Sequence, residues 1–225
     1  SAQEKILDSS ILKREIERFT VEFAWKSSKI EGNTYSLLET EILIKQMKEA
    51  AGHTKYEAQM ILNHKSAIDY ILRSPSKFKE LTINKIVNFH SILVKDLEVS
   101  AGIRKNKVAI TGAEYIPLSN PKEIEIALQK IVDVTNKIDF PLAKALFIAL
   151  MIAYLQPFVD GNKRTSRTLA NAILIAYDLY PLSYRDVDII EYIKAMILFY
   201  ETNNIYHFKR IFINQFNFSI NNYFQ

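Results

Sequence analysis

The chain has 225 residues, 48% of them hydrophobic and 24% charged, so it is long enough for a buried core and has the composition of a globular protein. It contains no cysteine, which excludes disulfides and thiolate metal sites. The net charge of +4 is mild, basic residues form no long run, and no signal peptide or membrane-length apolar stretch is visible, so we expect a cytoplasmic protein that binds neither nucleic acid nor a membrane.

Helical periodicity dominates the chain, and the count of only five glycines agrees with a mostly α-helical fold. The second and third predicted helices begin with capping boxes, Ser36 with Glu39 and Thr54 with Glu57. Helices are expected over the stretches Glu4–Ser28, Ser36–Gly52, Thr54–Leu72, Ile83–Leu97, Pro121–Asn136, Leu142–Leu155, Ala170–Tyr177, Asp188–Glu201 and Tyr206–Asn221.

One stretch has the pattern of strands. Lys107–Ile110 and Glu114–Ile116 flank Thr111, Gly112 and Ala113, which is typical of a β-hairpin with a glycine-containing turn. A two-stranded ribbon is marginal alone and is expected to lean on the helices. The sequence therefore predicts an all-α bundle with one small β-hairpin.

A polar stretch separates two strongly apolar ones, Leu142–Leu155 and Ala170–Tyr177. Its polar residues include Asp160, Gly161, Asn162, Lys163, Arg164 and Arg167. Such a loop between two buried helices puts backbone N–H groups at a helix N-terminus, where the dipole attracts anions. Arg164 and Arg167 are three residues apart and can face the same phosphates, while Asp160 is a hard oxygen ligand suited to Mg²⁺. The pattern predicts a phosphate or nucleotide site; a capped helix with a surface charge cluster is the alternative.

The run from Gln156 to Arg167, Gln-Pro-Phe-Val-Asp-Gly-Asn-Lys-Arg-Thr-Ser-Arg, resembles the signature of the Fic (Fido) family, H-x-F-x-[DE]-G-N-[GK]-R-x-x-R. Members of this family typically transfer AMP from ATP to a hydroxyl of a target protein. The resemblance covers about Phe19 to Phe216 and implies a Fic-like helical bundle. One position departs from the signature, because Gln156 stands where the family has a histidine.

A second motif lies near the N-terminus. Ser27, Glu31, Gly32 and Asn33 resemble the inhibitory motif [ST]-x-x-x-E-[GN] of one class of the family. A glutamate at a helix C-terminus is repelled by the dipole, so a cationic partner is expected. In the family this glutamate pairs with the second signature arginine, here Arg167, and blocks the position of the γ-phosphate. We expect one Fic-like domain over residues 1–225, with the N-terminal helices and inhibitory motif in 1–52 and the Fic core and C-terminal helices in 53–225.

The resemblance also implies roles for the signature residues. Asp160 would coordinate an Mg²⁺ ion that bridges the phosphates of ATP. Gly161 and Asn162 would form the anion hole for the α- and β-phosphates, with Gly161 allowing close backbone approach. Arg164 would contact the β-phosphate side. Arg167 would contact the γ-phosphate or, in the resting state, the inhibitory glutamate.

In the family a hairpin "flap" follows a Gly-x-x-Arg element, present here in loose form as Gly102-Ile-Arg104. The flap docks the main chain of the target protein by strand addition. The expected docking residues are Val108, Ala109, Ile110, Thr111 and Gly112. A structural hairpin without a partner is the alternative. The expected partners are thus a nucleotide and a target protein, and the sequence leaves a homodimer open.

The substitution at position 156 bears directly on activity. The family histidine accepts the proton of the target hydroxyl as a general base, whereas a Gln amide is not basic. Losing a positioned base costs about 10²–10⁴ in rate, so transfer through Gln156 should be weakened or lost. Lys163 replaces the commoner glycine and also occurs in phosphate-transferring Doc-type relatives, but those lack the final arginine that Arg167 supplies here.

Four hypotheses follow from these residues. The chain is a degenerate Fic protein that binds a nucleotide, an active AMP- or phosphotransferase with another base, an ordinary AMP-transferase in which Gln156 was introduced, or a non-catalytic interaction module.

Overall fold

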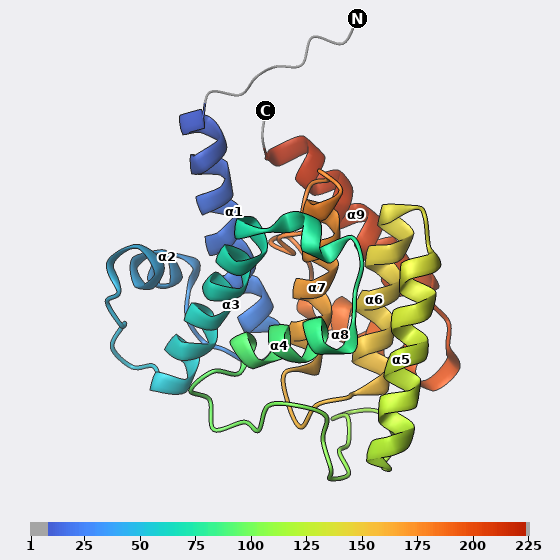
Figure 1. Ribbon diagram of the computed structural model, residues 1–225. Helices are drawn as coiled ribbons and strands as arrows, with labels where there is room; N and C mark the ends of the chain where they lie inside the picture. The colour runs from blue at the N-terminus through green and yellow to red at the C-terminus, as the bar shows by residue number, and fades with distance from the viewer. Residues whose placement is uncertain (1–8, 224–225) are drawn as a thin grey trace, which may run out of the picture.

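The computed structural model describes residues 9–223 (Figure 1). Within this range the chain forms nine α-helices, one 3-10 turn and no strand, which confirms the predicted all-helical class. The predicted beginning of the first helix at Glu4 lies outside the described residues. The elements are α1 (Ser9–Ile30), α2 (Leu37–Gln46), α3 (Lys55–Arg73), η1 (Pro75–Phe78), α4 (Ile83–Leu93), α5 (Pro121–Lys137), α6 (Pro141–Leu155), α7 (Asn162–Ala176), α8 (Ile189–Thr202) and α9 (Tyr206–Asn222).

Both predicted capping boxes are present. At the start of α2 the Glu39 N–H donates to Ser36 Oγ at 3.2 Å, and the Ser36 N–H donates to the Glu39 carboxylate at 2.8 Å. Thr54 and Glu57 make the same reciprocal pair at the start of α3. These bonds satisfy backbone donors that a helix N-terminus otherwise leaves without acceptors.

Two predicted helix ends and one predicted start are wrong. The helix expected over Ala170–Tyr177 already begins at Asn162 as α7, because its polar first turns are buried by residues from other helices and are not marked by apolar side chains. The second helix ends at Gln46 rather than near Gly52, because Met47 takes a left-handed conformation with φ 54° and donates its N–H to Leu43 O at 3.0 Å. The helix expected to reach Leu97 ends at Leu93. A left-handed residue terminates a helix whatever its side chain, and a methionine gives no signal of that conformation in the sequence.

The helix α7 lies at the centre of the molecule, with α6 along one side and α1 and α3 on the other (Figure 1). Almost every residue of α7 is buried. Apolar side chains from α1 and from α3 to α9 converge on α6 and α7 in one continuous core. The loop that joins α6 to α7 is therefore anchored at both ends in the core of the protein.

A smaller apolar cluster joins α2 to α1 and α3 through Ala24, Tyr35, Leu43, Ala58 and Ile61. It lies beside the turn that follows α1. This packing fixes the direction in which the chain leaves α1, which matters for the inhibitory motif at that point.

The predicted β-hairpin does not form strands. Residues 105–118, which we call the flap loop, have a turn at residues 111–112 in which the Ala113 N–H donates to Ile110 O at 3.1 Å. The N–H groups of Glu114 and Tyr115 both donate to Glu201 Oε1 in α8, at 2.6 and 3.0 Å. A carboxylate on a neighbouring helix thus takes donors that a cross-strand partner would have used, and the two arms stay unpaired.

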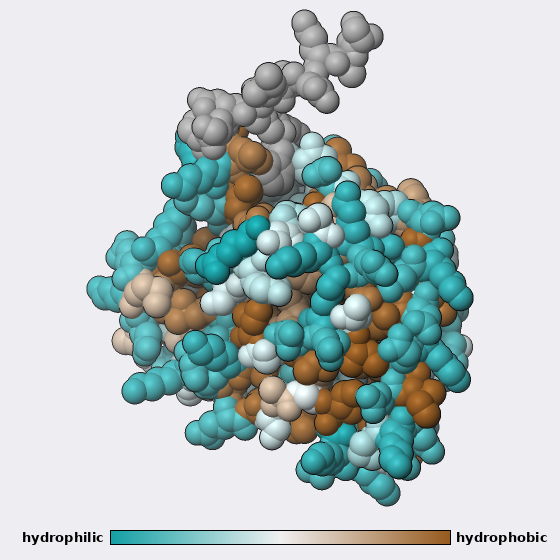
Figure 2. Space-filling view, in the orientation of Figure 1, coloured by the Kyte–Doolittle hydropathy of each residue, from teal (hydrophilic) through white to brown (hydrophobic). Residues whose placement is uncertain are grey.

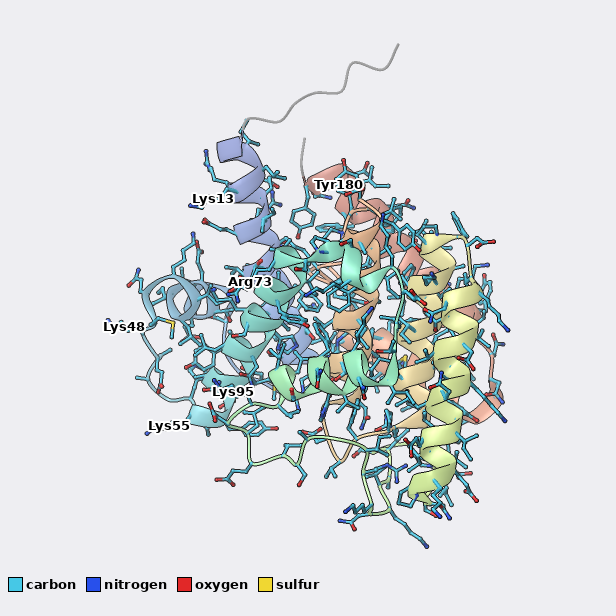
Figure 3. All side chains as sticks on the ribbon, in the orientation of Figure 1. Lys13, Lys48, Lys55, Arg73, Lys95 and Tyr180 are labelled. Carbon is cyan, nitrogen blue, oxygen red and sulfur yellow. The ribbon has the colours of Figure 1, made fainter. Side chains whose placement is uncertain are left out.

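Hydrophilic residues cover much of the face seen in Figure 2. Basic side chains are spread over it: in Figure 3 the labelled Lys13, Lys48, Lys55, Arg73 and Lys95 stand well apart, and all are exposed. Among residues 9–223, no helix combines the length and the apolar character needed to span a membrane.

Candidate functional site

The loop between α6 and α7 is closed on itself by the side chain of Asn162. Asn162 Oδ1 accepts from the Phe158 N–H, and Asn162 Nδ2 donates to Phe158 O, both at 2.9 Å. The Phe158 ring is buried and stacks on His90, with ring centroids 3.7 Å apart. The Asn162 amide is thus used to shape the loop, and its backbone N–H is what it contributes to the helix N-terminus.

Gly161 and His90 set how closely the loop approaches α4. Gly161 has φ 79°, and an added Cβ would lie 3.0 Å from Val94 Cγ1 and 3.4 Å from His90 Nε2, so glycine is required by both conformation and space. Burial lowers the pKa of His90 to about 4, and its neutral ring donates from Nε2 to Asp160 O at 2.8 Å. Sequence reasoning missed this support of the loop by His90.

A pocket of about 340 Å³ opens in front of this loop. It is lined by the end of α1, by residues 108–111 of the flap loop, and by residues 156 and 159–163. The first hydrogen bond of α7 runs from the Thr165 N–H to Gly161 O at 2.8 Å, so the N–H groups of Asn162, Lys163 and Arg164 have no acceptor within the helix. With the positive end of the helix dipole, they make this pocket suited to an anion.

Arg164 and Asp160 form an ion pair at the edge of the pocket. Arg164 Nη2 lies 2.7 Å from Asp160 Oδ2, and the Arg164 side chain is buried whereas that of Asp160 is 53% exposed. The Tyr56 hydroxyl is 3.4 Å from the same carboxylate. Mg²⁺ bound to a nucleotide commonly takes one or two protein carboxylates and completes its shell with phosphate oxygens and water. The exposed Asp160 fits that requirement.

Glu31 joins the end of α1 to the first turns of α7. Its Oε1 lies 2.8 Å from Arg167 Nη2, and its Oε2 lies 3.1 Å from Lys163 Nζ. Burial by itself would raise the pKa of Glu31, but the charges of Arg167 and Lys163 outweigh it and lower the pKa to about 2. We call Glu31, Lys163 and Arg167 the clasp. The ion pair between Glu31 and Arg167 was expected from the resemblance, while the bond from Lys163 was not.

The Arg167 guanidinium is fully buried and engaged on all sides. Its Nε donates to Ser27 Oγ at 3.0 Å, its Nη2 donates to Ser27 O at 3.0 Å as well as to Glu31, and its Nη1 lies 3.3 Å from the Tyr192 hydroxyl. A buried guanidinium is costly unless it is paired and hydrogen-bonded. An anionic ligand that is to reach Arg167 must therefore displace Glu31.

The remaining motif residues shape the turn after α1. Gly32 has φ 92°, and its N–H donates to Lys29 O at 3.0 Å. Asn33 is buried; its Nδ2 donates to Glu57 O at 2.9 Å and its Oδ1 accepts from the Tyr35 N–H at 3.0 Å. Asn33 thus ties the turn to α3 and fixes where α1 presents Glu31.

Gln156 lies at the end of α6 and lines the pocket. Its Nε2 donates to Ala153 O at 2.6 Å, which leaves Oε1 as the free end of the amide. An amide oxygen accepts hydrogen bonds but does not take up a proton at physiological pH. Position 156 can therefore orient a hydroxyl but cannot deprotonate it.

Arg104 is a buried cation that bonds carbonyl oxygens. Its Nε donates to Gln156 O at 2.6 Å, its Nη1 donates to Asn106 O at 2.7 Å, and its Nη2 donates to Leu118 O. Asn106 and Leu118 lie near the two ends of the flap loop. Arg104 thus ties both ends of the flap loop to the end of α6, a role that the loose sequence motif did not reveal.

The two arms of the flap loop differ in how they are held. The second arm is fixed to the helices: its N–H groups donate to Glu201, and Tyr115 stacks on Tyr154 with ring centroids 4.3 Å apart. The first arm, which carries the expected docking residues Val108, Ala109, Ile110 and Thr111, lines the pocket. Gly112 lies at the turn against α8, where an added Cβ would come within 3.3 Å of Ile197 Cδ1.

Comparison with known proteins identifies relatives of this chain. Residues 80–174 match the Fic/DOC family. Protein adenylyltransferase Fic of Drosophila willistoni is 28% identical over 174 residues, which are 74% of this chain and 34% of that protein. Protein adenylyltransferase Fic of Nematostella vectensis is 25% identical over 190 residues, 82% of this chain and 44% of that protein. The chain thus spans about a third of the length of the first of these relatives and less than half of the second.

A solved structure has the same fold. Fic-1 from C. elegans aligns with a TM-score of 0.82 at 22% identity, covering 97% of this chain and 66% of that one. The similarity extends beyond the segment that matches the family and includes the helices on either side of it.

Proposed function

Residues 80–174 of this chain belong to the Fic/DOC family, and on that premise we propose that the chain is a nucleotide-binding protein that takes ATP and is related to protein adenylyltransferases. The relatives that carry the adenylyltransferase name are much longer than this chain. The pocket supplies what the phosphates of a nucleotide require, namely free backbone N–H groups and a helix N-terminus. Gly161 permits close approach of the backbone to them.

The observation that carries the proposal is the clasp. Glu31 lies at the pocket with both carboxylate oxygens bonded to cations of the first turns of α7, Lys163 and Arg167. A carboxylate bonded to a guanidinium and an ammonium is chemically similar to a phosphate bonded by the same groups. We therefore assign Glu31 as an internal substitute for the last phosphate of ATP, so that the described state is a resting state.

Magnesium fits the same site. Asp160 would hold the ion beside the phosphates, with Arg164 keeping the carboxylate in position through the bond at 2.7 Å. When bound, Mg²⁺ neutralises phosphate charge and supports departure of pyrophosphate. The backbone of Gly161 and Asn162 would contact the inner phosphates.

The reaction that fits this arrangement is transfer of AMP to a Ser, Thr or Tyr hydroxyl of a target protein. The hydroxyl oxygen would bond to the α-phosphorus, the bond from that phosphorus to pyrophosphate would break, and the hydroxyl proton must leave. Gln156 offers the hydroxyl an acceptor but cannot take its proton. We therefore expect ATP binding with little transfer. The target's main chain would lie along the first arm of the flap loop, whose backbone donors are not used by a second strand.

Calorimetry with ATP tests this proposal. The parent chain and Glu31→Gly would be titrated with and without Mg²⁺, together with Asp160→Asn in the Glu31→Gly background. We expect binding that needs Mg²⁺, is stronger in Glu31→Gly, and loses its Mg²⁺ dependence in Asp160→Asn. If neither the parent nor Glu31→Gly binds ATP, the proposal that the chain binds a nucleotide is rejected, and the hypothesis of a non-catalytic interaction module is favoured.

A further inference from the structure

A fully buried histidine of α3 lies directly behind the clasp and has no part in the proposed function so far. His64 Nε2 is 2.8 Å from Ser27 Oγ, and His64 Nδ1 is 2.9 Å from Met60 O. Ser28 Oγ lies 3.3 Å from the same Nδ1. Three elements thus meet here: α3 carries His64, α1 carries the two serines, and α7 carries Arg167, which Ser27 bonds.

The direction of each hydrogen bond follows from the chemistry of the groups. Burial, together with the charges of Arg164 and Arg167, lowers the pKa of His64 to about 3, so the ring is neutral and has one N–H and one bare nitrogen. Met60 O can only accept, so Nδ1 carries the proton. Nε2 is then the bare nitrogen, and it accepts a hydrogen bond from the Ser27 hydroxyl.

This arrangement decides where the lone pairs of Ser27 point. With its proton directed to His64, Ser27 Oγ presents a lone pair to Arg167 Nε at 3.0 Å. Without an acceptor on α3, a serine inside a helix tends to donate to the carbonyl four residues earlier, which changes its rotamer. The oxygen would then leave Arg167 Nε without a partner in a buried place.

We propose that His64 is a positioning residue that, through Ser27, fixes the guanidinium of Arg167 in the orientation needed to bond the third phosphate of ATP. The ligand in this inference, ATP, rests on the proposed function, whereas the contacts among His64, Ser27 and Arg167 do not depend on it. In the described structure the hydrogen bonds of His64 go to Met60, Ser27 and Ser28, and His64 does not line the pocket, so its effect on a bound phosphate would pass through Ser27 and Arg167. Ser27 and Arg167 are both fully buried and hydrogen-bonded to each other, so we expect their bond to persist when Glu31 moves away.

Two adjacent serines provide a matched pair of variants. Ser27 and Ser28 are both fully buried and both contact His64, but only Ser27 bonds Arg167. In the Glu31→Gly background, Ser27→Ala and His64→Leu should each reduce the preference for ATP over ADP by about tenfold, the size expected for loss of one hydrogen bond to a charged group. ADP affinity should stay constant. Ser28→Ala should keep the preference, and His64→Gln should retain most of it because its amide can still accept from Ser27.

Calorimetry with ATP and ADP measures these preferences. Equal effects of Ser27→Ala and Ser28→Ala, or an unchanged preference in His64→Leu, would overturn the proposal, and circular dichroism would check that each variant folds. A second readout needs no nucleotide: the Nε–H of Arg167 should exchange slowly with solvent by NMR in the parent and about tenfold faster in Ser27→Ala, but not in Ser28→Ala. Unchanged exchange in Ser27→Ala would also overturn it, whereas absent ATP binding with the expected exchange would reject only the proposed ligand.

Discussion

Glu31 and Lys163 of the clasp line the same pocket as the first arm of the flap loop, but the clasp and the flap loop are held by different kinds of interaction. In the clasp, Glu31 reaches Arg167 across 136 residues of sequence, and its carboxylate pairs with the buried guanidinium of Arg167 and with the partly exposed ammonium of Lys163. In the flap loop, Arg104 and Glu201 bond backbone groups at its base and second arm, while the first arm lines the pocket. The clasp is a closed contact between charged side chains, whereas the first arm of the flap loop has no cross-strand partner in the described part of the chain.

This difference separates two properties of the site. Changes in the clasp should alter nucleotide affinity and the pH dependence of stability. Changes in the flap loop should alter local order with little effect on the phosphate site. Gln156 is connected to both parts of the site. Its backbone carbonyl accepts a hydrogen bond from Arg104 at the base of the flap loop, and its side chain lines the pocket.

The largest expected effect is on the transfer of AMP to protein. It is tested with the clasp removed by Glu31→Gly, so that the role of position 156 can be measured. In the Glu31→Gly background, Gln156→His should increase labelling of proteins by radioactive ATP about 10²–10⁴-fold, because it restores a general base. Gln156→Asn is the matched control, since it keeps an amide without a base. If Glu31→Gly labels proteins equally with and without Gln156→His, another group takes the proton of the target hydroxyl.

A second prediction breaks the clasp by protonation. The pKa of Glu31 is lowered to about 2, so the ion pair should add on the order of 3 kcal/mol to the free energy of unfolding above the ordinary carboxylate pKa. That contribution should be constant from pH 6 to 8, begin to fall below about pH 4.5, and be gone below about pH 2. Denaturant unfolding of the parent and Glu31→Gln across this range measures it.

The control for this titration is the exposed pair of Glu41 and Lys45, whose atoms are 2.6 Å apart. Glu41→Gln should change stability by less than about 1 kcal/mol at any pH, because solvent screens an exposed pair. If Glu31→Gln behaves like Glu41→Gln, the carboxylate is not held as described.

A third prediction concerns the base of the flap loop. Arg104→Met should lower the free energy of unfolding by about 2 kcal/mol, because three carbonyl oxygens lose a buried charged donor. Lys105→Met, at an exposed neighbouring position, should change it by less than about 0.5 kcal/mol. Similar values for the two variants in thermal and denaturant unfolding would contradict the role assigned to Arg104.

The smallest expected effect is local. Glu201→Ala should speed hydrogen exchange of the Glu114 and Tyr115 amides by about tenfold and change global stability by about 0.5 kcal/mol or less, since the site is exposed. Lys194→Ala, on the same helix and 71% exposed, should leave both amides unchanged. Unaltered exchange in Glu201→Ala would mean that the second arm is held by Tyr115 alone.

Several helix starts could be predicted from the sequence because local chemistry sets them, although the start of α7 at Asn162 was missed. The capping boxes at Ser36 and Thr54 and the proline at Pro121 each satisfy or remove backbone donors within a few residues, and the structure has them. The end of α2 could not be predicted, because Met47 adopts a left-handed conformation without any local signal. The predicted β-hairpin was wrong for a similar reason: the N–H groups of Glu114 and Tyr115 donate to Glu201, which lies far along the chain.

The candidate site divides in the same way. The polar run around Gly161 and Asn162 lies between two apolar segments, so a loop that presents backbone N–H groups at a helix N-terminus could be predicted from the sequence, and the structure has it. The bond from Lys163 to Glu31, the carbonyl bonds of Arg104 and the support of Ser27 by His64 depend on how distant helices pack. Periodicity marks such residues as buried or exposed but does not say which partners they meet.

Competition between Glu31 and the third phosphate is the central claim, and comparing ATP with ADP by calorimetry in the parent and Glu31→Gly tests it most directly. The clasp predicts that the parent binds both nucleotides weakly and alike, that Glu31→Gly prefers ATP by about tenfold or more, as expected for a bond between opposite charges, and that adding Arg167→Ala removes this preference. Equal ATP and ADP affinities in Glu31→Gly, or the same ATP affinity in the parent and Glu31→Gly, would contradict it.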